Sequence, residues 1–383
     1  MTLRIVADEN IPLVEALFGR NAQVVRVAGR DLTRDQLDDA EVLLVRSVTR
    51  VDAQLLTGTS VRFVGTATSG TDHIDRQCLQ ELGIGFCHAP GSNANSVVEY
   101  VLAAIAAVDD FLERLLAGGS VGIIGFGTIG RAVANRLRSL GIHCMVNDPW
   151  LEQDQLQDGG SLGEILACDV VCLHPELTHE QPWPSYHLLR AGELESLDAR
   201  QLLINASRGA VIDNRALYRR LTQDDAPHVV LDVWETEPLV CSNLLSMARL
   251  GTPHIAGYSY DGKILATRML RDAVQAQLYP GQARSPEPAG EPLPPLTLAS
   301  PASPAQVLRD LIRCCYRIDE DDQRLRSAVI NATEEQSRAS FDQLRKQYPR
   351  RRELAGRAVQ LATADPRLHD VVRALGCLPD GAV

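Results

Sequence analysis

The glycine-rich segment at residues 121–130, VGIIGFGTIG, constrains most strongly what this chain can fold into. Its apolar start predicts a short strand, and Gly125, Gly127 and Gly130 follow where a helix begins. In such a turn the first glycine allows a tight bend, the second lets the backbone approach a pyrophosphate, and the third lets the helix pack on the strand. The segment therefore predicts a dinucleotide-binding α/β domain with the pyrophosphate at a helix N-terminus.

Asp148 ends the next predicted strand, HCMVND at 143–148, close to the position that binds a ribose in such domains. Its carboxylate should accept hydrogen bonds from the ribose hydroxyls and repel a 2′-phosphate. NAD is therefore the expected cofactor, rather than NADP. The alternative is a glycine turn that holds no ligand, and an acidic residue at this spacing argues against it.

The rest of the chain predicts further α/β units, since 383 residues are too many for one ordinary core. Short β-rich runs alternate with helical stretches both before and after the glycine-rich segment, which indicates parallel sheets with covered faces. The runs lie at 3–8, 23–28, 42–47, 62–68 and 84–89, and then at 121–125, 143–148, 170–174, 201–206, 228–234 and 249–255. A long helix should start at a capping box, Ser96-x-x-Glu99, and run to Gly118.

A proline-rich stretch near residues 280–304 predicts a connector, and the last eighty residues are rich in arginine and helix formers. We therefore expect two doubly wound parallel-sheet α/β domains, Rossmann-like or flavodoxin-like, and a small C-terminal α+β domain. The expected bounds are 1–95 with 258–283 for the first domain, 96–257 for the nucleotide domain, and 284–383 for the C-terminal domain.

Composition and charge argue against several classes of partner. The formal net charge of −11 disfavours nucleic acid and anionic membrane surfaces. Nine scattered cysteines without metal-like spacing predict reduced thiols of a cytoplasmic protein and no metal site. The longest apolar run, VVEYVLAAIAAVDDFL, is too short and too acidic to span a bilayer, and the N-terminal MTLRIVADEN does not resemble a signal peptide.

Three polar residues follow predicted strands of the nucleotide domain, where strand ends face the ligand crevice. They are Arg208 in NASRGA, Glu237 in DVWETEP and His254 in TPHIAG. Oxidation of a hydroxy acid needs a cation for the carboxylate, a base for the hydroxyl proton and a group that orients the base. Each residue has another interpretation when taken singly. Arg208 could form an ion pair at the surface, Glu237 could be a turn residue before a proline, and His254 could be a core histidine whose ring nitrogens are hydrogen-bonded. Their joint placement after strands of one sheet favours a catalytic set.

These motifs together resemble the D-isomer-specific 2-hydroxyacid dehydrogenases over roughly residues 1–280. The resemblance implies that Arg208, Glu237 and His254 are the catalytic residues. It also implies contacts with NAD from the following residues: Gly125, Gly127, Thr128, Ile129, Gly130, Asp148, Pro175, Ser207, Asp232 and Gly257.

Further segments are similar to one branch of this family, whose members oxidise a small phosphorylated hydroxy acid. They include VADENIP, LLVRSVTRV, FVGTATSGTDHID, APGSNANSVVEYV, HIAGYSYDGK and, near the C-terminus, FDQLRKQYPRRRE. This likeness implies that Ser47, Thr68 and Tyr258 contact the substrate, and we add Arg46 because it ends the same strand as Ser47. It also implies that the C-terminal domain helps to form a homodimer.

Two features leave questions open. The family usually has threonine after the histidine of its Leu-His motif, but Pro175 stands here, which leaves that side-chain contact open while the backbone can still approach NAD. The basic cluster at Arg345–Arg352 is either a solvated helix face or a phosphate-capturing group acting across a dimer. Two other functions also remain open: a 3-phosphoglycerate or glycerate type of dehydrogenase, and a non-enzymatic NAD-sensing scaffold.

Overall fold

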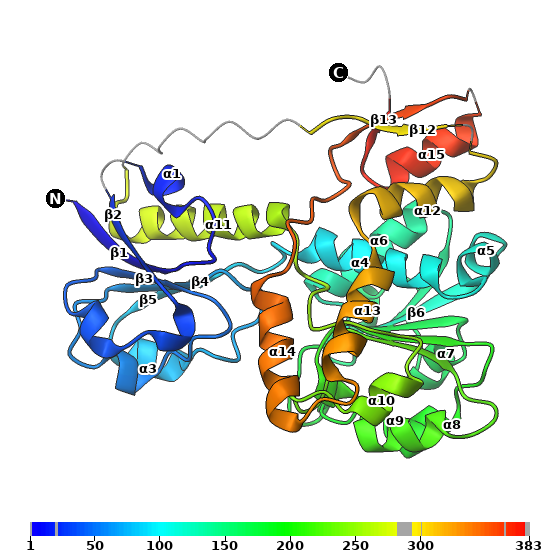
Figure 1. The fold of residues 1–383 in the computed structure, drawn as a ribbon, viewed down its shortest axis with the longest axis horizontal. Coiled ribbons are helices and arrows are strands. Elements are labelled where there is room, and N and C mark those ends of the chain that lie inside the picture. Colours follow the sequence, from blue (N-terminus) through cyan, green and yellow to red (C-terminus); the bar gives the residue numbers. More distant parts are fainter. Residues whose placement is uncertain (1, 20–21, 282–292, 300, 364, 380–383) are drawn as a thin grey trace. The chain divides into compact units, whose positions relative to one another are not determined.

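A computed structural model describes residues 2–19, 22–281, 293–299, 301–363 and 365–379 of the chain (Figure 1). Its contacts divide these residues into two compact units. The first contains described residues of Met1–Asn93 and Ser259–Pro292, and the second those of Ala94–Tyr258 and Leu293–Val383. The first boundary falls after 93 rather than 95, and the nucleotide domain ends at 258 rather than 257. The expected C-terminal domain lies in the same unit as the nucleotide domain.

The first unit is built on a five-stranded parallel sheet in the order β2-β1-β3-β4-β5, which is the flavodoxin-like order. Its strands are β1 (Leu3–Asp8), β2 (Ala22–Val27), β3 (Val42–Val45), β4 (Phe63–Thr66) and β5 (Gly85–His88). The helices are α1 (Val14–Phe18), α2 (Ala53–Leu56), α3 (Arg76–Glu81) and α11 (Tyr260–Leu278), with 3₁₀ turns η1 (Gly29–Asp31) and η2 (Arg34–Leu37). β3 and β4 are buried along their whole length, as expected for a parallel sheet with covered faces.

The second unit contains a six-stranded parallel sheet in the order β11-β10-β9-β8-β6-β7. Its strands are β6 (Ser120–Ile124), β7 (His143–Asn147), β8 (Val170–Leu173), β9 (Leu202–Asn205), β10 (His228–Leu231) and β11 (Leu250–Gly251). The helices are α4 (Ala94–Ala107), α5 (Phe111–Leu116), α6 (Thr128–Ser139), α7 (Leu162–Leu166), α8 (Ala191–Glu195), α9 (Asn214–Leu221) and α10 (Ser242–Met247), with η3 (Gln153–Gln155) and η4 (Gly209–Val211). The chain order reverses between β6 and β8, which is where doubly wound sheets bind ligands.

The predicted bounds of one helix and two strands were wrong. The long helix begins at Ala94 and is interrupted before Phe111, so Ser96 and Glu99 lie inside α4 and do not cap it. The Ser96 hydroxyl instead donates to the Ala256 carbonyl at 2.8 Å, and Glu99 accepts a hydrogen bond from the Leu354 N–H at 2.6 Å. Both side chains serve long-range packing that a local pattern cannot reveal.

The predicted strand at 249–255 is also shorter in the structure, where only Leu250–Gly251 pairs with β10. The strand at 228–234 ends at Leu231. The cause is the Asp232 carboxylate, which accepts the backbone N–H groups of Ile255 and Ala256 at 2.8 and 2.9 Å. Because these N–H groups bond to a side chain, the backbone turns away from the sheet.

The C-terminal segment is α+β, as predicted. It contains a parallel sheet of β12 (Leu296–Leu298), β13 (Ala358–Leu361) and β14 (Leu378–Pro379), with helices α12 (Pro304–Cys315), α13 (Ile318–Val329), α14 (Glu334–Lys346) and α15 (Pro366–Ala374). Helices α12 and α13 pack against α4 (Figure 1), and their apolar residues join the buried clusters of the nucleotide domain. This shared core explains why the two parts form one unit. Residues 282–292 of the proline-rich stretch lie outside the described residues.

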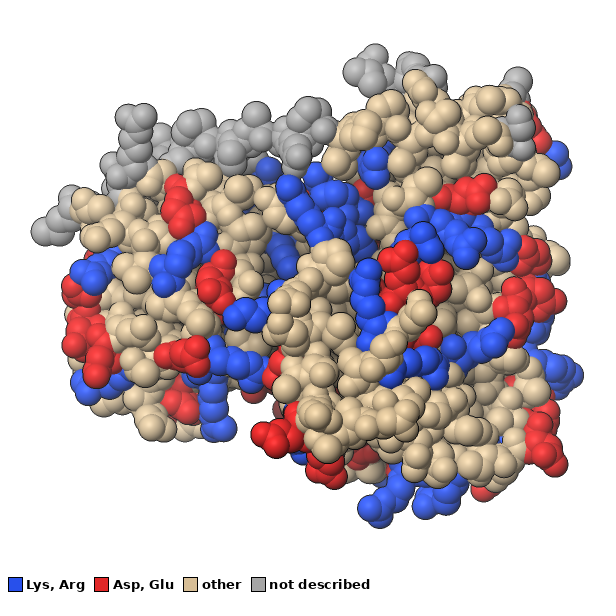
Figure 2. All heavy atoms as spheres, in the orientation of Figure 1, with Lys and Arg blue, Asp and Glu red and all other residues tan. Residues whose placement is uncertain are grey.

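Basic and acidic side chains are both spread over the face drawn in Figure 2. The nine cysteines, all within the described residues, are free thiols. The described residues contain no helix long and apolar enough to cross a membrane. In the same part of the chain, no group of three His, Cys, Asp or Glu side chains has the arrangement of a metal site.

Candidate active site

The glycine turn after β6 has the shape that a dinucleotide requires. Gly125 has a φ of 86°, and a β-carbon there would lie 2.4 Å from the backbone nitrogen of Pro175. A β-carbon at Gly130 would lie 2.0 Å from the Gly125 carbonyl oxygen. Gly127, by contrast, caps α6 and has open space where its β-carbon would be. The first and third glycines are thus required by the fold, whereas the second leaves room for a ligand at the helix N-terminus.

Asp148 directly follows β7 and is tied to this turn. One carboxylate oxygen accepts the Phe126 N–H at 2.8 Å, and the other accepts the Trp150 N–H at 3.1 Å. Asp148 therefore links the end of β7 to the glycine turn. Each carboxylate oxygen can accept more than one hydrogen bond, so the residues present fit a ribose at this position.

His174 and Pro175 follow β8, on the other side of the topological switch point. Both ring nitrogens of His174 are buried and have no hydrogen-bond partner among the described residues. Burial lowers the pKa of His174 to about 4, so its imidazole is neutral near pH 7. The Pro175 backbone lies against Gly125, which places the proline beside the nucleotide turn even though its side chain offers no hydrogen bond.

The loop after β9 carries Ser207 and Arg208. The Ser207 hydroxyl donates to Asn205 Oδ1 at 2.8 Å, and Asn205 Nδ2 donates to the Arg208 carbonyl at 3.0 Å. The partly buried Arg208 side chain donates from Nη1 to the Ser207 carbonyl at 2.9 Å. A β-carbon at Gly209 would lie 2.0 Å from the backbone carbon of Trp234, so this loop packs closely against the one after β10. The absence of a side chain at Gly209 lets the loop that carries Arg208 lie against the DVWETEP segment.

His254 and Glu237 form a hydrogen-bonded pair, with 2.7 Å between Nδ1 and Oε2. The other carboxylate oxygen of Glu237 accepts the Trp234 N–H at 2.8 Å. The side chains are 32% and 22% exposed, so the pair is half-buried but accessible. Because Glu237 occupies Nδ1, Nε2 is the ring atom that remains for a proton transfer.

The backbone of His254 lies in the left-handed region, with a φ of 55°. It is held there by Asp232, whose carbonyl accepts the His254 N–H at 2.7 Å and whose carboxylate also accepts the Thr252 hydroxyl at 2.6 Å. Sequence analysis assigned Asp232 only to the cofactor. The structure gives it a further task, which is to shape the turn that presents His254. No local sequence pattern signalled this task.

Electrostatics favour an ionised Glu237. Burial raises the pKa of its carboxyl group. Four interactions lower it: the charge of His254, the hydrogen bond with His254, the hydrogen bond from the Trp234 N–H and the charge of Arg345. Together they outweigh burial, so the pKa of Glu237 lies below its ordinary value. Glu237 is therefore a carboxylate near neutral pH and can stabilise a positive charge on the imidazole.

The expected substrate contacts fall in both units. Arg46 and Ser47 directly follow β3 in the first unit, and Ser47 is exposed. Thr68 lies just after β4, where its hydroxyl donates to the Gly70 carbonyl at 2.7 Å and lies 2.7 Å from the Thr66 hydroxyl. Tyr258 belongs to the second unit, four residues after His254.

The basic cluster at Arg345–Arg352 is not a uniform solvated face. Arg351 is only 5% exposed, and it donates to the carbonyls of Ser96 and Ala256 at 3.0 and 3.3 Å while stacking on Tyr316 at 4.3 Å. It is a structural link between the C-terminal segment and α4. Arg345 instead contacts Tyr258, with its guanidinium carbon 5.6 Å from the ring centre. The sequence left open a solvated helix face or a phosphate-capturing role across a dimer, and neither alternative includes these two contacts within the chain.

Comparison with known proteins agrees with this architecture. The model of the D-isomer specific 2-hydroxyacid dehydrogenase NAD-binding domain matches residues 99–256, and a domain of unknown function, DUF3410, matches residues 289–376. D-lactate dehydrogenase from Aquifex aeolicus, complexed with NAD and lactic acid, has a TM-score of 0.59 at 23% identity and covers 72% of this chain and 95% of that one. An NAD-dependent formate dehydrogenase from Staphylococcus aureus has a TM-score of 0.58 at 21% identity, with 74% and 97% covered.

Curated relatives match at much higher identity. The erythronate-4-phosphate dehydrogenase of Marinobacter nauticus is 46% identical over 97% of this chain and 98% of the relative. The enzyme of the same name from Stutzerimonas stutzeri is 43% identical over 98% and 99%. The chain therefore belongs to the erythronate-4-phosphate dehydrogenases, within the D-isomer specific 2-hydroxyacid dehydrogenase family, and its nucleotide cofactor is NAD.

Proposed function

We propose that this protein oxidises 4-phospho-D-erythronate to (R)-3-hydroxy-2-oxo-4-phosphooxybutanoate with NAD, as a step in the biosynthesis of pyridoxal 5′-phosphate. The observation that carries this proposal is the 46% identity with a named relative over nearly the whole of both chains. The 2.7 Å pair of His254 and Glu237, presented after β10 and β11, supplies the acid–base group that such a reaction needs.

The chemistry is the loss of a hydride from C2 and of a proton from its hydroxyl. NAD, when bound, accepts the hydride. In our proposal His254 takes the hydroxyl proton at Nε2 as the C–O bond becomes a carbonyl. Glu237 stabilises the resulting imidazolium through Nδ1, and Arg208 holds the substrate carboxylate and stabilises negative charge on the reacting oxygen. The products are then NADH, a proton and the 2-oxo acid.

We assign NAD to the turn of Gly125, Gly127 and Gly130, with Asp148 at the ribose. Its further contacts, by family resemblance, are Thr128, Ile129, Pro175, Ser207, Asp232 and Gly257. The open space at Gly127 and the position of Asp148 beside the turn support this assignment. We assign substrate contacts to Tyr258 and, in the first unit, to Arg46, Ser47 and Thr68.

The test is an assay of the purified protein with 4-phospho-D-erythronate and NAD, following the absorbance of NADH. 3-Phosphoglycerate and glycerate serve as matched substrates, because they distinguish the other dehydrogenase types. We expect the highest kcat/KM with 4-phospho-D-erythronate. A higher kcat/KM with 3-phosphoglycerate or glycerate would refute 4-phospho-D-erythronate as the substrate. NAD binding without turnover of any of the three acids would instead favour the non-enzymatic scaffold.

We also propose a homodimer located in the cytoplasm. The C-terminal motif FDQLRKQYPRRRE supports the dimer by family resemblance, and nine free thiols suit a reducing compartment. Light scattering on the intact chain should give twice its mass of 41.8 kDa, whereas a single chain mass would contradict the dimer. Deletion of the C-terminal segment is a poor test, because it removes α12 and α13 from the buried surface of α4. Fractionation of cells should recover the protein with cytoplasmic markers.

A further inference from the structure

We infer that Arg345, in the last turn of α14, is a positioning residue of the proposed active site in its own chain. It orients Tyr258 and supplies positive charge beside Glu237. The inference rests on the proposed function, since it assigns a task at the same site. It differs from a phosphate-capturing role across a dimer, because every group involved lies within one compact unit of one chain.

The contacts of Arg345 converge on residues of the proposed site. Its guanidinium lies over the Tyr258 ring, with the guanidinium carbon 5.6 Å from the ring centre. It also interacts electrostatically with Glu237 and Asp232. Burial disfavours its charge, but these neighbours outweigh burial and raise the pKa of Arg345, so it remains a cation. One C-terminal side chain thus contacts a proposed substrate residue and interacts electrostatically with the carboxylate that partners His254.

The surrounding residues hold α14 firmly enough for such a role. Phe341, one turn before Arg345, is fully buried in the cluster that contains Leu325 of α13. After the helix, the Tyr348 hydroxyl donates to Asp321 at 2.8 Å, and the Tyr348 ring meets Tyr258 edge-on at 5.8 Å. Arg345 therefore reaches Tyr258 from an anchored helix rather than from a free surface segment.

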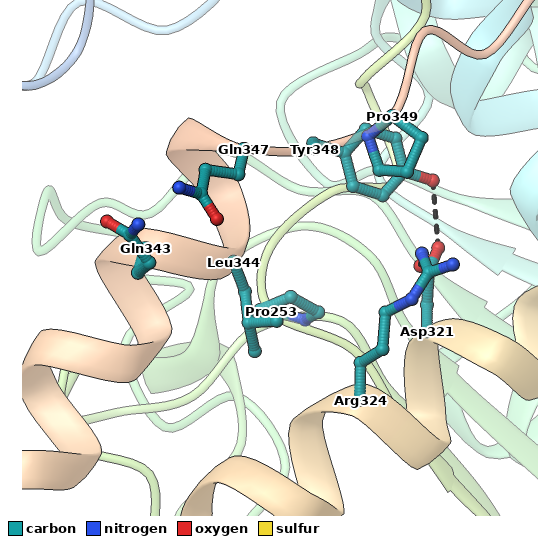
Figure 3. Close-up of a pocket in the computed structure, with 8 residues that line it drawn as sticks. All are labelled: Pro253, Asp321, Arg324, Gln343, Leu344, Gln347, Tyr348 and Pro349. Carbon is teal, nitrogen blue, oxygen red and sulfur yellow. Dashed lines mark hydrogen bonds and ion pairs between the residues drawn. The ribbon is translucent and has the colours of Figure 1, made fainter.

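A small cavity lies beside this arrangement (Figure 3), with a volume of about 230 Å³. Pro253, which precedes His254, lines it together with Gln343, Leu344, Tyr348 and other residues of the C-terminal segment. In Figure 3 the Tyr348 hydroxyl is directed at Asp321, at one side of the cavity. The His254 turn, α13 and α14 thus border the same cavity, so α14 lies close to the turn that presents the acid–base pair.

The charge of Arg345 has a predictable effect on the pair. Among the charged or titratable groups that interact with Glu237 or Arg345 are His254, Tyr258 and Asp232. Arg345 lowers the pKa of Glu237, though less than His254 does, and burial acts in the opposite direction. Removing this cation makes protonation of the pair easier. Because oxidation needs the unprotonated base and an ionised Glu237, the acid limb of the rate profile should move to higher pH.

The experiment compares Arg345→Met, Arg345→Lys and Arg338→Met with the unaltered protein. Methionine keeps an apolar stem without charge, lysine keeps the charge without the planar fork, and Arg338 is an exposed residue of the same helix. We expect Arg345→Met to lower kcat/KM about twofold to thirtyfold, the loss typical of a cation–π contact. The acid limb of the pH–rate profile of this variant should move to higher pH. Arg345→Lys should keep the pH profile but not the full kcat/KM, and Arg338→Met should match the unaltered protein.

A double-mutant cycle with Tyr258→Leu, which removes the ring that Arg345 contacts, separates positioning from general damage. If Arg345 acts through Tyr258, the double variant loses less kcat/KM than the product of the two single losses. Multiplicative losses, or an Arg345→Met enzyme with unchanged kcat/KM and pH profile, would overturn the inference. Melting temperature and NAD binding are measured on every variant, so that a folding defect is recognised. Failure of the proposed function can be told apart from failure of this inference, because the unaltered protein would then be inactive with 4-phospho-D-erythronate.

Discussion

Nδ1 of His254 lies 2.7 Å from Oε2 of Glu237, and the other oxygen of that carboxylate accepts the Trp234 N–H. The carboxylate is therefore held from two sides, and it fixes both the orientation of the imidazole and the position of its proton. The ring nitrogen directed away from Glu237 is Nε2. This geometry gives the proposed division of labour, in which His254 moves the proton and Glu237 stabilises the imidazolium.

His254→Ala should lower kcat by roughly 10²–10⁴-fold, the loss expected for a missing general base. Affinity for NAD should change little, because the glycine turn after β6 does not depend on the imidazole. Steady-state kinetics and a nucleotide titration of the same preparation check both parts. A variant that retains most of its kcat would remove His254 from the role of base.

Glu237→Gln should shift the pH dependence of both reaction directions. The imidazolium loses its counter-charge, so it gives up its proton at lower pH. Oxidation needs neutral imidazole and should therefore extend to lower pH, whereas reduction needs the protonated ring and should be confined to lower pH. The kcat should also fall, because the glutamine amide can donate to Nδ1 and favour the wrong tautomer. Rate profiles that overlay those of the unaltered enzyme in both directions would disprove the pairing.

Asp148→Ala should weaken the preference for NAD over NADP. A negative charge no longer faces a 2′-phosphate, so the ratio of kcat/KM values should move towards NADP. The structure adds a second effect, since Asp148 also accepts the Phe126 N–H of the glycine turn. The KM for NAD itself should therefore rise. An unchanged ratio of the two cofactors would show that Asp148 does not face the ribose.

His174→Leu should reduce the loss of stability in mild acid. Burial lowers the pKa of the imidazole to about 4 in the folded protein, whereas the pKa in the unfolded chain is near 6.5. The neutral imidazole therefore adds its full stabilisation to the folded state above pH 6.5, and this stabilisation is lost as the pH falls towards 4. Between pH 7 and pH 5 this one group should cost about 2 kcal/mol of unfolding free energy, by linkage. Urea unfolding at both pH values measures the difference. Equal pH dependence in the two proteins would contradict a buried, neutral His174.

Much of the fold followed from local patterns. The spacing of Gly125, Gly127 and Gly130 after an apolar run predicted the nucleotide domain, because only glycine fits the turn and the close contact of helix and strand. Alternating strand and helix patterns predicted both parallel sheets, since burial on two faces demands apolar runs. The residue types and positions of Arg208, Glu237 and His254 likewise carried the functional hypothesis, because they follow strands of one sheet.

Tertiary structure decided what depends on partners distant in the chain. Ser96 and Glu99 matched a capping box, but their side chains bond to Ala256 and Leu354, which no local window contains. Asp232 shapes the His254 turn only because the chain returns to it after β11.

The C-terminal segment shows the same limit. The sequence predicts its α+β character from a stretch rich in arginine and helix formers, and such composition is a local property. Its packing on α4 and the contact of Arg345 with Tyr258 were not predictable, because they arise from long-range burial and electrostatics. The contact of Arg345 with Tyr258 joins residues 87 positions apart, and only the folded chain brings them together.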